Sequence, residues 1–191
     1  MVKKQSVKTG GRSVYRQRAR SADRCDQSGQ RVALDLVRVD PDRPDRLLRR
    51  GWGGAEITGN IARSSRNRQK MSLVKTGGKP AHTIVNVMDA WTRPGISLFR
   101  CTLMTGRTHQ IRVHLSSHGF PVLCDPLYGR EKSHLGSVKD PALLEFLKTH
   151  NGQMLHAEVL EFKHPTTGEQ MHFKSRMPID MMELKEILDG E

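Results

Sequence analysis

The stretch that decides the fold is residues 81–118, AHTIVNVMDAWTRPGISLFRCTLMTGRTHQIRVHLSSH. Its first part, residues 81–88, is rich in β-branched residues, and polar residues alternate along part of it, as in a half-buried strand. A second strand is predicted at residues 96–103. Because the residues between them, 92–95, contain a Pro-Gly turn, the two strands are predicted to pair as an antiparallel hairpin.

The chain continues from this hairpin into a predicted helix over residues 107–118, which Gly119 is well placed to end. Asp140 and Pro141 give the N-cap and first-turn signals of another helix. The remaining predicted elements are a helix at 142–147, strands at 155–162 and 169–175, and an amphipathic helix at 178–188 with Met181, Leu184 and Leu188 on its apolar stripe. The pattern predicts the α+β class, with a mixed, largely antiparallel sheet and a few helices.

Composition limits the kinds of function. The 191 residues hold 32 Lys and Arg against 20 Asp and Glu, so the formal net charge is +12. Such a balance favours a polyanionic partner, nucleic acid first, with a ribosomal-type binding protein as the plain alternative. No apolar run is long enough to span a membrane, and three widely spaced cysteines fit neither a disulfide framework nor a cysteine zinc site. We therefore expect a cytoplasmic protein.

The positive charge lies mainly in the first third. Residues 1–70 hold 18 Lys and Arg and 7 Asp and Glu. Residues 1–32 are Arg-rich with a single aromatic residue, which predicts disorder. No stable element is expected for the apolar run at 32–37, because prolines and an Arg-rich segment follow it. We expect two parts: residues 1–55, an Arg-rich, disordered or non-native segment, and residues 56–191, the folded part.

The candidate functional side chains lie at the junction between the second predicted strand and the predicted helix. Residues 104–114 bring two Arg, two His, a Gln and two Thr together there. Exposed amides at a helix start, with Arg107 and Arg112 nearby, can bind a phosphate or a carboxylate. The alternative is a solvated helix with a charged face, and composition favours neither.

The order of the residues from Thr105 to Gly129 closely resembles a signature of the RluA-like pseudouridine synthases, which isomerise uridine in ribosomal and transfer RNA. The resemblance covers about residues 56–188, and one departure is Cys124, where the family usually has glycine. Further similarities are Gly59-Asn60-Ile61 with Arg63, Arg68, Lys70 and Met71; Gly78-Lys79-Pro80-Ala81-His82-Thr83; Leu155-His156-Ala157; and His164-Pro165.

The resemblance implies a pseudouridine-synthase-like catalytic domain that is incomplete. In this family a flipped-out uridine enters a pocket, an aspartate acts on it, the glycosidic bond to N1 breaks, and the uracil reattaches through C5. The resemblance implies no cofactor and no metal, RNA as the partner, and we expect a monomer that does not bind a membrane. By position, Arg107 is the partner of the catalytic aspartate. The implied RNA-binding residues are His109, Gln110, Arg112, Arg63, Arg68 and Lys70.

The family's aspartate motif, His-Arg-Leu-Asp followed by Thr-Ser-Gly, does not occur in the sequence. The segment most similar to this motif ends at Asp40, and short partial matches of this kind arise easily by chance. The family's pocket tyrosine is missing too, and Trp52 occupies its neighbourhood. One hypothesis explains both absences: residues 1 to about 55 derive from a shifted reading frame.

Three functional hypotheses stay open. The chain is a pseudouridine synthase in which another carboxylate replaces the missing aspartate, a catalytically dead RNA-binding remnant of such an enzyme, or an unrelated basic structural protein. His109, His114 and His118 suggest a metal site, but no third carboxylate or cysteine ligand lies near them in sequence, so a structural or RNA-facing role is favoured.

Overall fold

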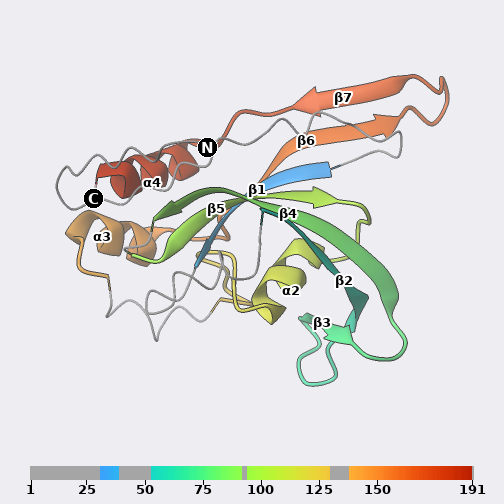
Figure 1. The fold of residues 1–191 in the computed structure, drawn as a ribbon, viewed down its shortest axis with the longest axis horizontal. Helices are drawn as coiled ribbons and strands as arrows, with labels where there is room; N and C mark the ends of the chain where they lie inside the picture. The colour runs from blue at the N-terminus through green and yellow to red at the C-terminus, as the bar shows by residue number, and fades with distance from the viewer. Residues whose placement is uncertain (1–30, 39–52, 92–93, 130–137, 191) are drawn as a thin grey trace, which may run out of the picture.

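The computed structural model describes residues 31–38, 53–91, 94–129 and 138–190. The strands are β1 (Arg31–Arg38), β2 (Gly53–Arg63), β3 (Met71–Val74), β4 (Lys79–Trp91), β5 (Ile96–Leu103), β6 (Leu155–Lys163) and β7 (Gln170–Lys174), and the helices are α2 (Gln110–Ser117), α3 (Pro141–Thr149) and α4 (Ile179–Gly190). The strands form one sheet in the order β3-β2-β4-β5-β1-β6-β7, and every described pair is antiparallel. The α+β class is confirmed (Figure 1).

The predicted hairpin is confirmed as β4 and β5. The two strands pair from Thr83 opposite Leu103 to Trp91 opposite Ile96, with an irregularity between Val87 and Asp89. The strand predicted at 81–88 extends further at both ends, and the one predicted at 96–103 matches β5. Part of the predicted turn, residues 92–93, lies outside the described residues.

The expectation of no stable element at residues 32–37 is wrong, because this run lies within β1. β5 pairs with β1 along its whole length, from Arg31 opposite Leu103 to Arg38 opposite Ile96, and β6 pairs on the other side. Both neighbours of β1 in the sheet come from distant parts of the sequence. Whether such a segment forms a strand depends on pairing in the folded protein more than on its own residues. β1 and the start of β2 precede the boundary predicted at residue 55. The division into 1–55 and 56–191 stays a prediction.

The helix predicted over 107–118 is shorter than expected. α2 begins at Gln110, because His109 has a left-handed backbone (φ 56°, ψ 24°) through which a right-handed helix cannot continue. Residues 107–109 therefore belong to the preceding loop. Gly119, with φ 88°, follows the last turn, as expected for a glycine that ends a helix.

The two other predicted helices are confirmed as α3 and α4. Asp140 caps α3, since its carboxylate accepts the Leu143 N–H at 2.8 Å, and Pro141 is the first helical residue. The predicted apolar stripe of α4, Met181, Leu184 and Leu188, is buried. The hairpin predicted from 155–162 and 169–175 is β6 and β7.

β5 explains why helices cover both faces of the sheet. Successive side chains on a strand point to opposite faces, so Phe99 and Cys101 lie on one face and Ile96 and Leu98 on the other. All four are buried. The first face packs against α2 through Ile111 and Leu115, and the second against α3 and α4 through Leu143, Met181, Leu184 and Leu188. With a core on each side, β5 is a rigid support for the loop that follows it.

Among the described helices, none is both long and apolar enough to cross a membrane.

Candidate functional site

The loop between β5 and α2 is held by the side chain of Gln110, which is 3% exposed. Its Oε1 accepts hydrogen bonds from the Thr105 hydroxyl at 2.8 Å and the Arg107 N–H at 3.0 Å. Its Nε2 donates to the His82 carbonyl and the Thr83 hydroxyl, both at 2.9 Å. Four bonds use the full capacity of the amide. The structure therefore places Gln110, predicted to bind RNA, inside the loop, where it fixes the loop against β4.

Arg107 lies on this braced loop, beside the start of β4. Its Nε donates to the Pro80 carbonyl at 2.9 Å. Within the described ranges, no carboxylate forms an ion pair with Arg107, and its terminal N–H groups make no hydrogen bond. A guanidinium has five donors in a planar fork, so those of Arg107 that remain can bind an anion.

Arg112, also predicted to bind RNA, is buried in a two-pronged ion pair. Its Nε and Nη2 each donate to Asp125 at 2.8 Å. Asp125 also accepts the N–H groups of Leu127 and Tyr128. Burial alone would raise the pKa of Asp125, but these bonds outweigh it and the pKa lies below its usual value. The hydrogen bonding of Arg112 to Asp125 raises the pKa of Arg112 in turn. This pair joins α2 to the following turn.

Tyr128 connects the signature to the β2–β3 hairpin. Its hydroxyl accepts the Met71 N–H at 2.7 Å and lies 3.0 Å from His109 Nδ1. The Arg112 guanidinium is 4.9 Å from the ring centroid, and the Lys70 ammonium is 5.7 Å from it. Both distances suit a cation–π contact. Tyr128 therefore sets the position of His109 and Lys70 relative to each other.

Two histidines of this region have lowered pKa values. Burial, followed by repulsion from Arg112, lowers the pKa of His109. A neutral Nδ1 can accept the proton of the Tyr128 hydroxyl, which already receives the Met71 N–H. Burial lowers the pKa of His114 to about 4, and its Nδ1 lies 2.9 Å from the Thr83 hydroxyl.

Throughout the described residues there is no group of three or more His, Cys, Asp or Glu that could hold a metal.

Basic side chains gather around this site. From Ile57 to Cys124 the sequence holds ten Lys and Arg and one acidic residue, Asp89. At the turn between β2 and β3, Arg63 donates to the Arg68 carbonyl at 2.9 Å and closes the loop. The turn presents Arg63, Arg66, Arg68 and Lys70, and the next turn presents Lys75 and Lys79 beside Pro80, to which Arg107 bonds. This basic hairpin, residues 63–79, is suited to a phosphate backbone.

Of the residues singled out from sequence, Lys70, His109 and Arg112 meet at Tyr128, and the side chains of Gln110 and Arg112 are buried with internal partners. Asp40 and Trp52 lie outside the described residues. Sequence reasoning assigned no role to Asp125 or Tyr128. Their place in the signature was the available signal, since both fall in the same ordered run as Arg107.

Comparison with known proteins agrees with this arrangement. Residues 37–117 match the family model described as RNA pseudouridylate synthase. The chain is 39% identical over 133 residues to ribosomal large subunit pseudouridine synthase D of Neisseria meningitidis, and 46% identical over 129 residues to the protein of that name from Zymomonas mobilis. Over the matched residues the chain is similar to the RNA pseudouridine synthases. The resemblance to RluA-like enzymes is thereby confirmed.

The matched stretches are 70% and 67% of this chain but only 34% and 38% of those two relatives. Human RNA Pseudouridylate Synthase Domain Containing 1 has a similar fold, with a TM-score of 0.57 and 23% identity over 84% of this chain and 59% of that chain. The chain spans about two fifths or less of the length of the Neisseria meningitidis and Zymomonas mobilis relatives.

Proposed function

We propose that this chain acts in the isomerisation of uridine to pseudouridine in ribosomal or transfer RNA, as a monomeric cytoplasmic pseudouridine synthase. The observation that supports this most strongly is the loop of Arg107. Gln110 and β4 hold the loop rigidly, the loop lies in the family signature, and its guanidinium keeps unused donors beside the basic hairpin. Because the loop holds the N–H donors of Arg107 in place before a substrate binds, no free energy is needed to reorganise them on binding.

In this proposal Arg107 pairs with the catalytic carboxylate and keeps it ionised in a closed pocket, for which a planar guanidinium is well suited. Asp125 does not supply that carboxylate, because Arg112 and two backbone amides occupy it. No other described carboxylate is bonded to Arg107, and Asp40, which lies outside the described residues, is a weak candidate for the required group. Base extrusion costs a few kcal/mol, which contacts from Arg63, Arg68 and Lys70 to flanking phosphates offset.

A second candidate is an RNA-binding protein without turnover. It is favoured by the absence of a His-Arg-Leu-Asp run from the sequence and of a described carboxylate bonded to Arg107.

The deciding experiment measures tritium release from RNA that carries 5-tritiated uridine, with ribosomal and transfer RNA in separate reactions. When C5 becomes the glycosidic carbon, its hydrogen is lost to solvent. The proposal expects release above background that disappears in Arg107→Met, with RNA affinity retained, and persists in the control Lys139→Met. RNA binding without any release supports the second candidate, and absence of RNA binding overturns both.

A further inference from the structure

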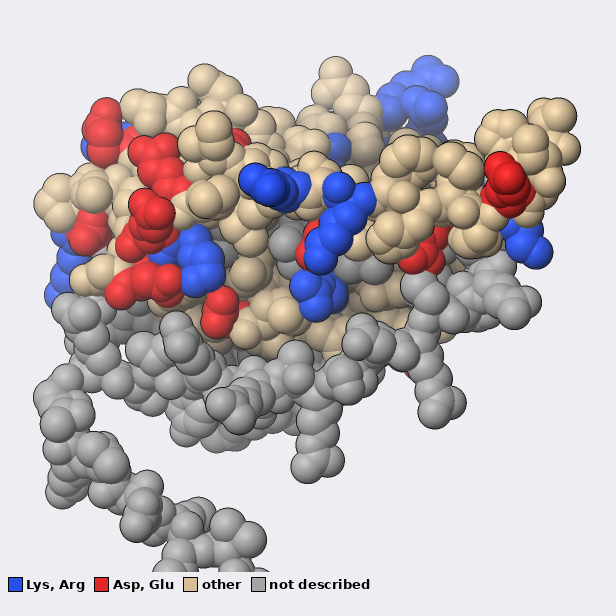
Figure 2. All heavy atoms as spheres, turned by 90° about the horizontal axis from the view of Figure 1, so that it is seen from above, with Lys and Arg blue, Asp and Glu red and all other residues tan. Residues whose placement is uncertain are grey.

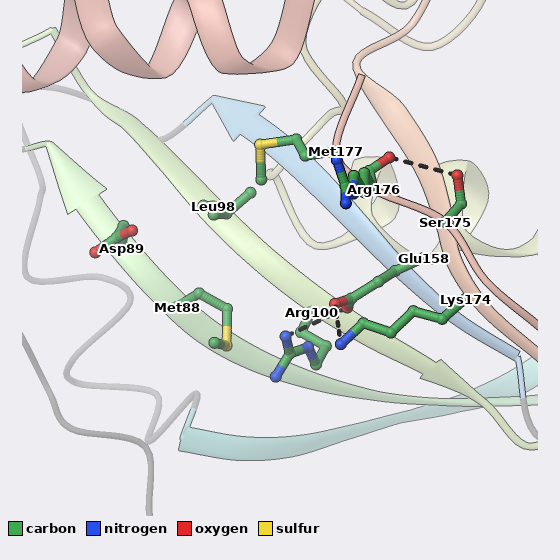
Figure 3. Close-up of a pocket in the computed structure, with 9 residues that line it drawn as sticks. All are labelled: Met88, Asp89, Leu98, Arg100, Glu158, Lys174, Ser175, Arg176 and Met177. Carbon is green, nitrogen blue, oxygen red and sulfur yellow. Dashed lines mark hydrogen bonds and ion pairs between the residues drawn. The ribbon is translucent and has the colours of Figure 1, made fainter. Parts of the chain in front are cut away.

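A groove lies on the sheet face that packs against α4, on the opposite side of β5 from the core under α2. Its volume is about 660 Å³, and its walls come from β4, β5, β6, the end of β7 and the segment between β7 and α4 (Figure 3). This volume is typical of ligand pockets, which span roughly 300–1,000 Å³. None of the residues that position Arg107 lines it.

One side of the groove carries an excess of positive charge. Arg100 lies 3.3 Å from Glu158, and Lys174 lies 4.0 Å from the other oxygen of the same carboxylate. Arg176 is exposed and forms no ion pair with a described residue. Two cations thus share one carboxylate, and Arg176 adds a third positive charge without a carboxylate of its own among the described residues. Figure 3 shows the charged ends of Arg100, Glu158 and Lys174 converging.

The second acidic residue of the groove does not alter this balance. Asp89 lies apart from the charged cluster in Figure 3, and Lys185 is 3.8 Å from its carboxylate. The cluster of Arg100, Lys174 and Arg176 therefore retains net positive charge.

Arg100 is incompletely satisfied. Its Nε is buried and has no hydrogen-bond partner among the described residues. A buried donor without an acceptor is unfavourable, so the guanidinium gains by turning toward an additional anionic oxygen. Such an oxygen is what a phosphate in the groove would supply.

The floor of the groove is apolar. Met88, Leu98 and Met177 line it beside the cationic wall. A bare inorganic anion would leave this surface unused, whereas a nucleotide has a phosphate for the wall and a flat base for the floor. Methionine makes favourable contacts with aromatic rings.

The charge of the surrounding surface also favours a polyanion here. Figure 2 shows Lys and Arg gathered in the middle of this face, between the acidic residues over α4 and the β6–β7 hairpin, which is mostly tan with acidic and basic side chains toward its end. The acidic side chains on α3 and α4 repel a phosphate backbone and direct it toward the groove.

We propose that this groove is a second RNA-binding site that holds one nucleotide of a single-stranded segment. Arg100, Lys174 and Arg176 bind the phosphate, and the base lies on Met88, Leu98 and Met177. The inference rests on the proposed function for its choice of RNA as partner. It extends the RNA footprint to the face opposite α2.

The test measures binding of a single-stranded oligouridylate at several salt concentrations. The groove variant is Lys174→Gln with Arg176→Gln, and the control, Lys139→Gln with Lys148→Gln, removes the same charge from the region of α3. Each phosphate contact contributes about 0.7 to the slope of log affinity against log salt for single strands. Because the groove holds one phosphate, the groove variant should lower that slope by about 0.7 and weaken binding roughly tenfold more than the control.

Two further measurements identify the ligand. An oligonucleotide with 4-thiouridine should crosslink to the peptide that contains Lys174–Met177, and uridine monophosphate should compete where inorganic phosphate at equal concentration does not. Equal slopes for groove variant and control, with no crosslink in that peptide, would overturn the groove site alone. A parent protein that binds no RNA would instead overturn the proposed function and this inference together.

Discussion

Cys124 combines a left-handed backbone, with φ 57°, and a side chain that is 6% exposed. A Cβ is unfavourable at such a φ, and glycine avoids that cost. Cys124→Ala and Cys124→Gly both remove the thiol, and only the second removes the Cβ. We expect the glycine variant to be more stable than the alanine variant by about 1 kcal/mol, the reverse of the usual order. Urea unfolding of the two proteins measures this, and an alanine variant of equal or greater stability would refute a strained backbone at Cys124.

Arg107 and Arg112 lie five residues apart in one signature, yet their replacement should have unequal effects. Arg112→Met leaves Asp125 buried without its cation, so the free energy of unfolding should fall by about 3–5 kcal/mol. The side chain of Arg107 bonds only to the Pro80 carbonyl among the described residues, so Arg107→Met should change that free energy by less than about 1 kcal/mol.

Thermal and urea unfolding of both variants beside the parent would measure the contrast. A loss of several kcal/mol for Arg107→Met would mean that Arg107 already has a buried acidic partner. That partner would then be the leading candidate for the catalytic carboxylate.

At the residue scale, the sequence could locate the site but not the direction of each side chain. The ordered run from Thr105 to Gly129 indicated the loop and Arg107. It also gave Gln110 and Arg112 as RNA-binding residues; both side chains are buried with internal partners, and their part in RNA binding stays a prediction. Those partners, Thr83 and Asp125, come from β4 and from the turn after α2, and only the folded path of the chain brings them there.

At the scale of elements, α2 should make the stability depend on pH through His114. His114 is fully buried on it, and burial, then repulsion from His118 and His82, lowers its pKa from 6.5 to about 4. Between these two values the unfolded chain binds more protons than the folded one, so stability rises with pH. The contribution is fully present above pH 6.5 and is lost as the pH falls toward 4, by about 3 kcal/mol.

Urea unfolding at pH 7.5, 6.5, 5.5 and 4.5 would follow this loss. In His114→Gln the free energy of unfolding should change clearly less between pH 6.5 and 4.5 than in the parent, whatever the variant's stability at pH 7.5. The lowered pKa of His109 contributes in the same direction and remains in the variant. If parent and variant had parallel pH profiles, His114 would not be the group that titrates.

Elements with local signals could be predicted, and those that depend on distant pairing could not. The Pro-Gly turn indicated the hairpin of β4 and β5, and Asp140 with Pro141 indicated the start of α3. β1 was missed because both of its neighbours, β5 and β6, are distant in sequence. The start of α2 was misplaced because the left-handed backbone of His109 has no sequence signal comparable to glycine.

At the scale of the whole molecule, charge divides the folded part. Residues 125–191 hold eight Lys and Arg against twelve Asp and Glu, whereas the stretch from Ile57 to Cys124 is strongly basic. Charge counting from sequence could identify an excess in the first third. It could not show that the turns of the basic hairpin lie beside Arg107, since that proximity comes from the pairing of β2, β3 and β4.

The central claim is that the basic hairpin beside Arg107 binds RNA, and the most direct test is the affinity for ribosomal RNA fragments. Arg66 and Arg68 are exposed, and no described residue holds either side chain by a hydrogen bond or an ion pair. The variant Arg66→Gln with Arg68→Gln should bind about tenfold more weakly at low salt, with a salt slope reduced by about 1.4–1.8. The variant Lys139→Gln with Lys148→Gln, at the acidic end, should stay within about twofold of the parent in the same assay, because it touches no phosphate. Equal losses in the two variants would contradict the claim, because binding would then follow net charge and not this surface.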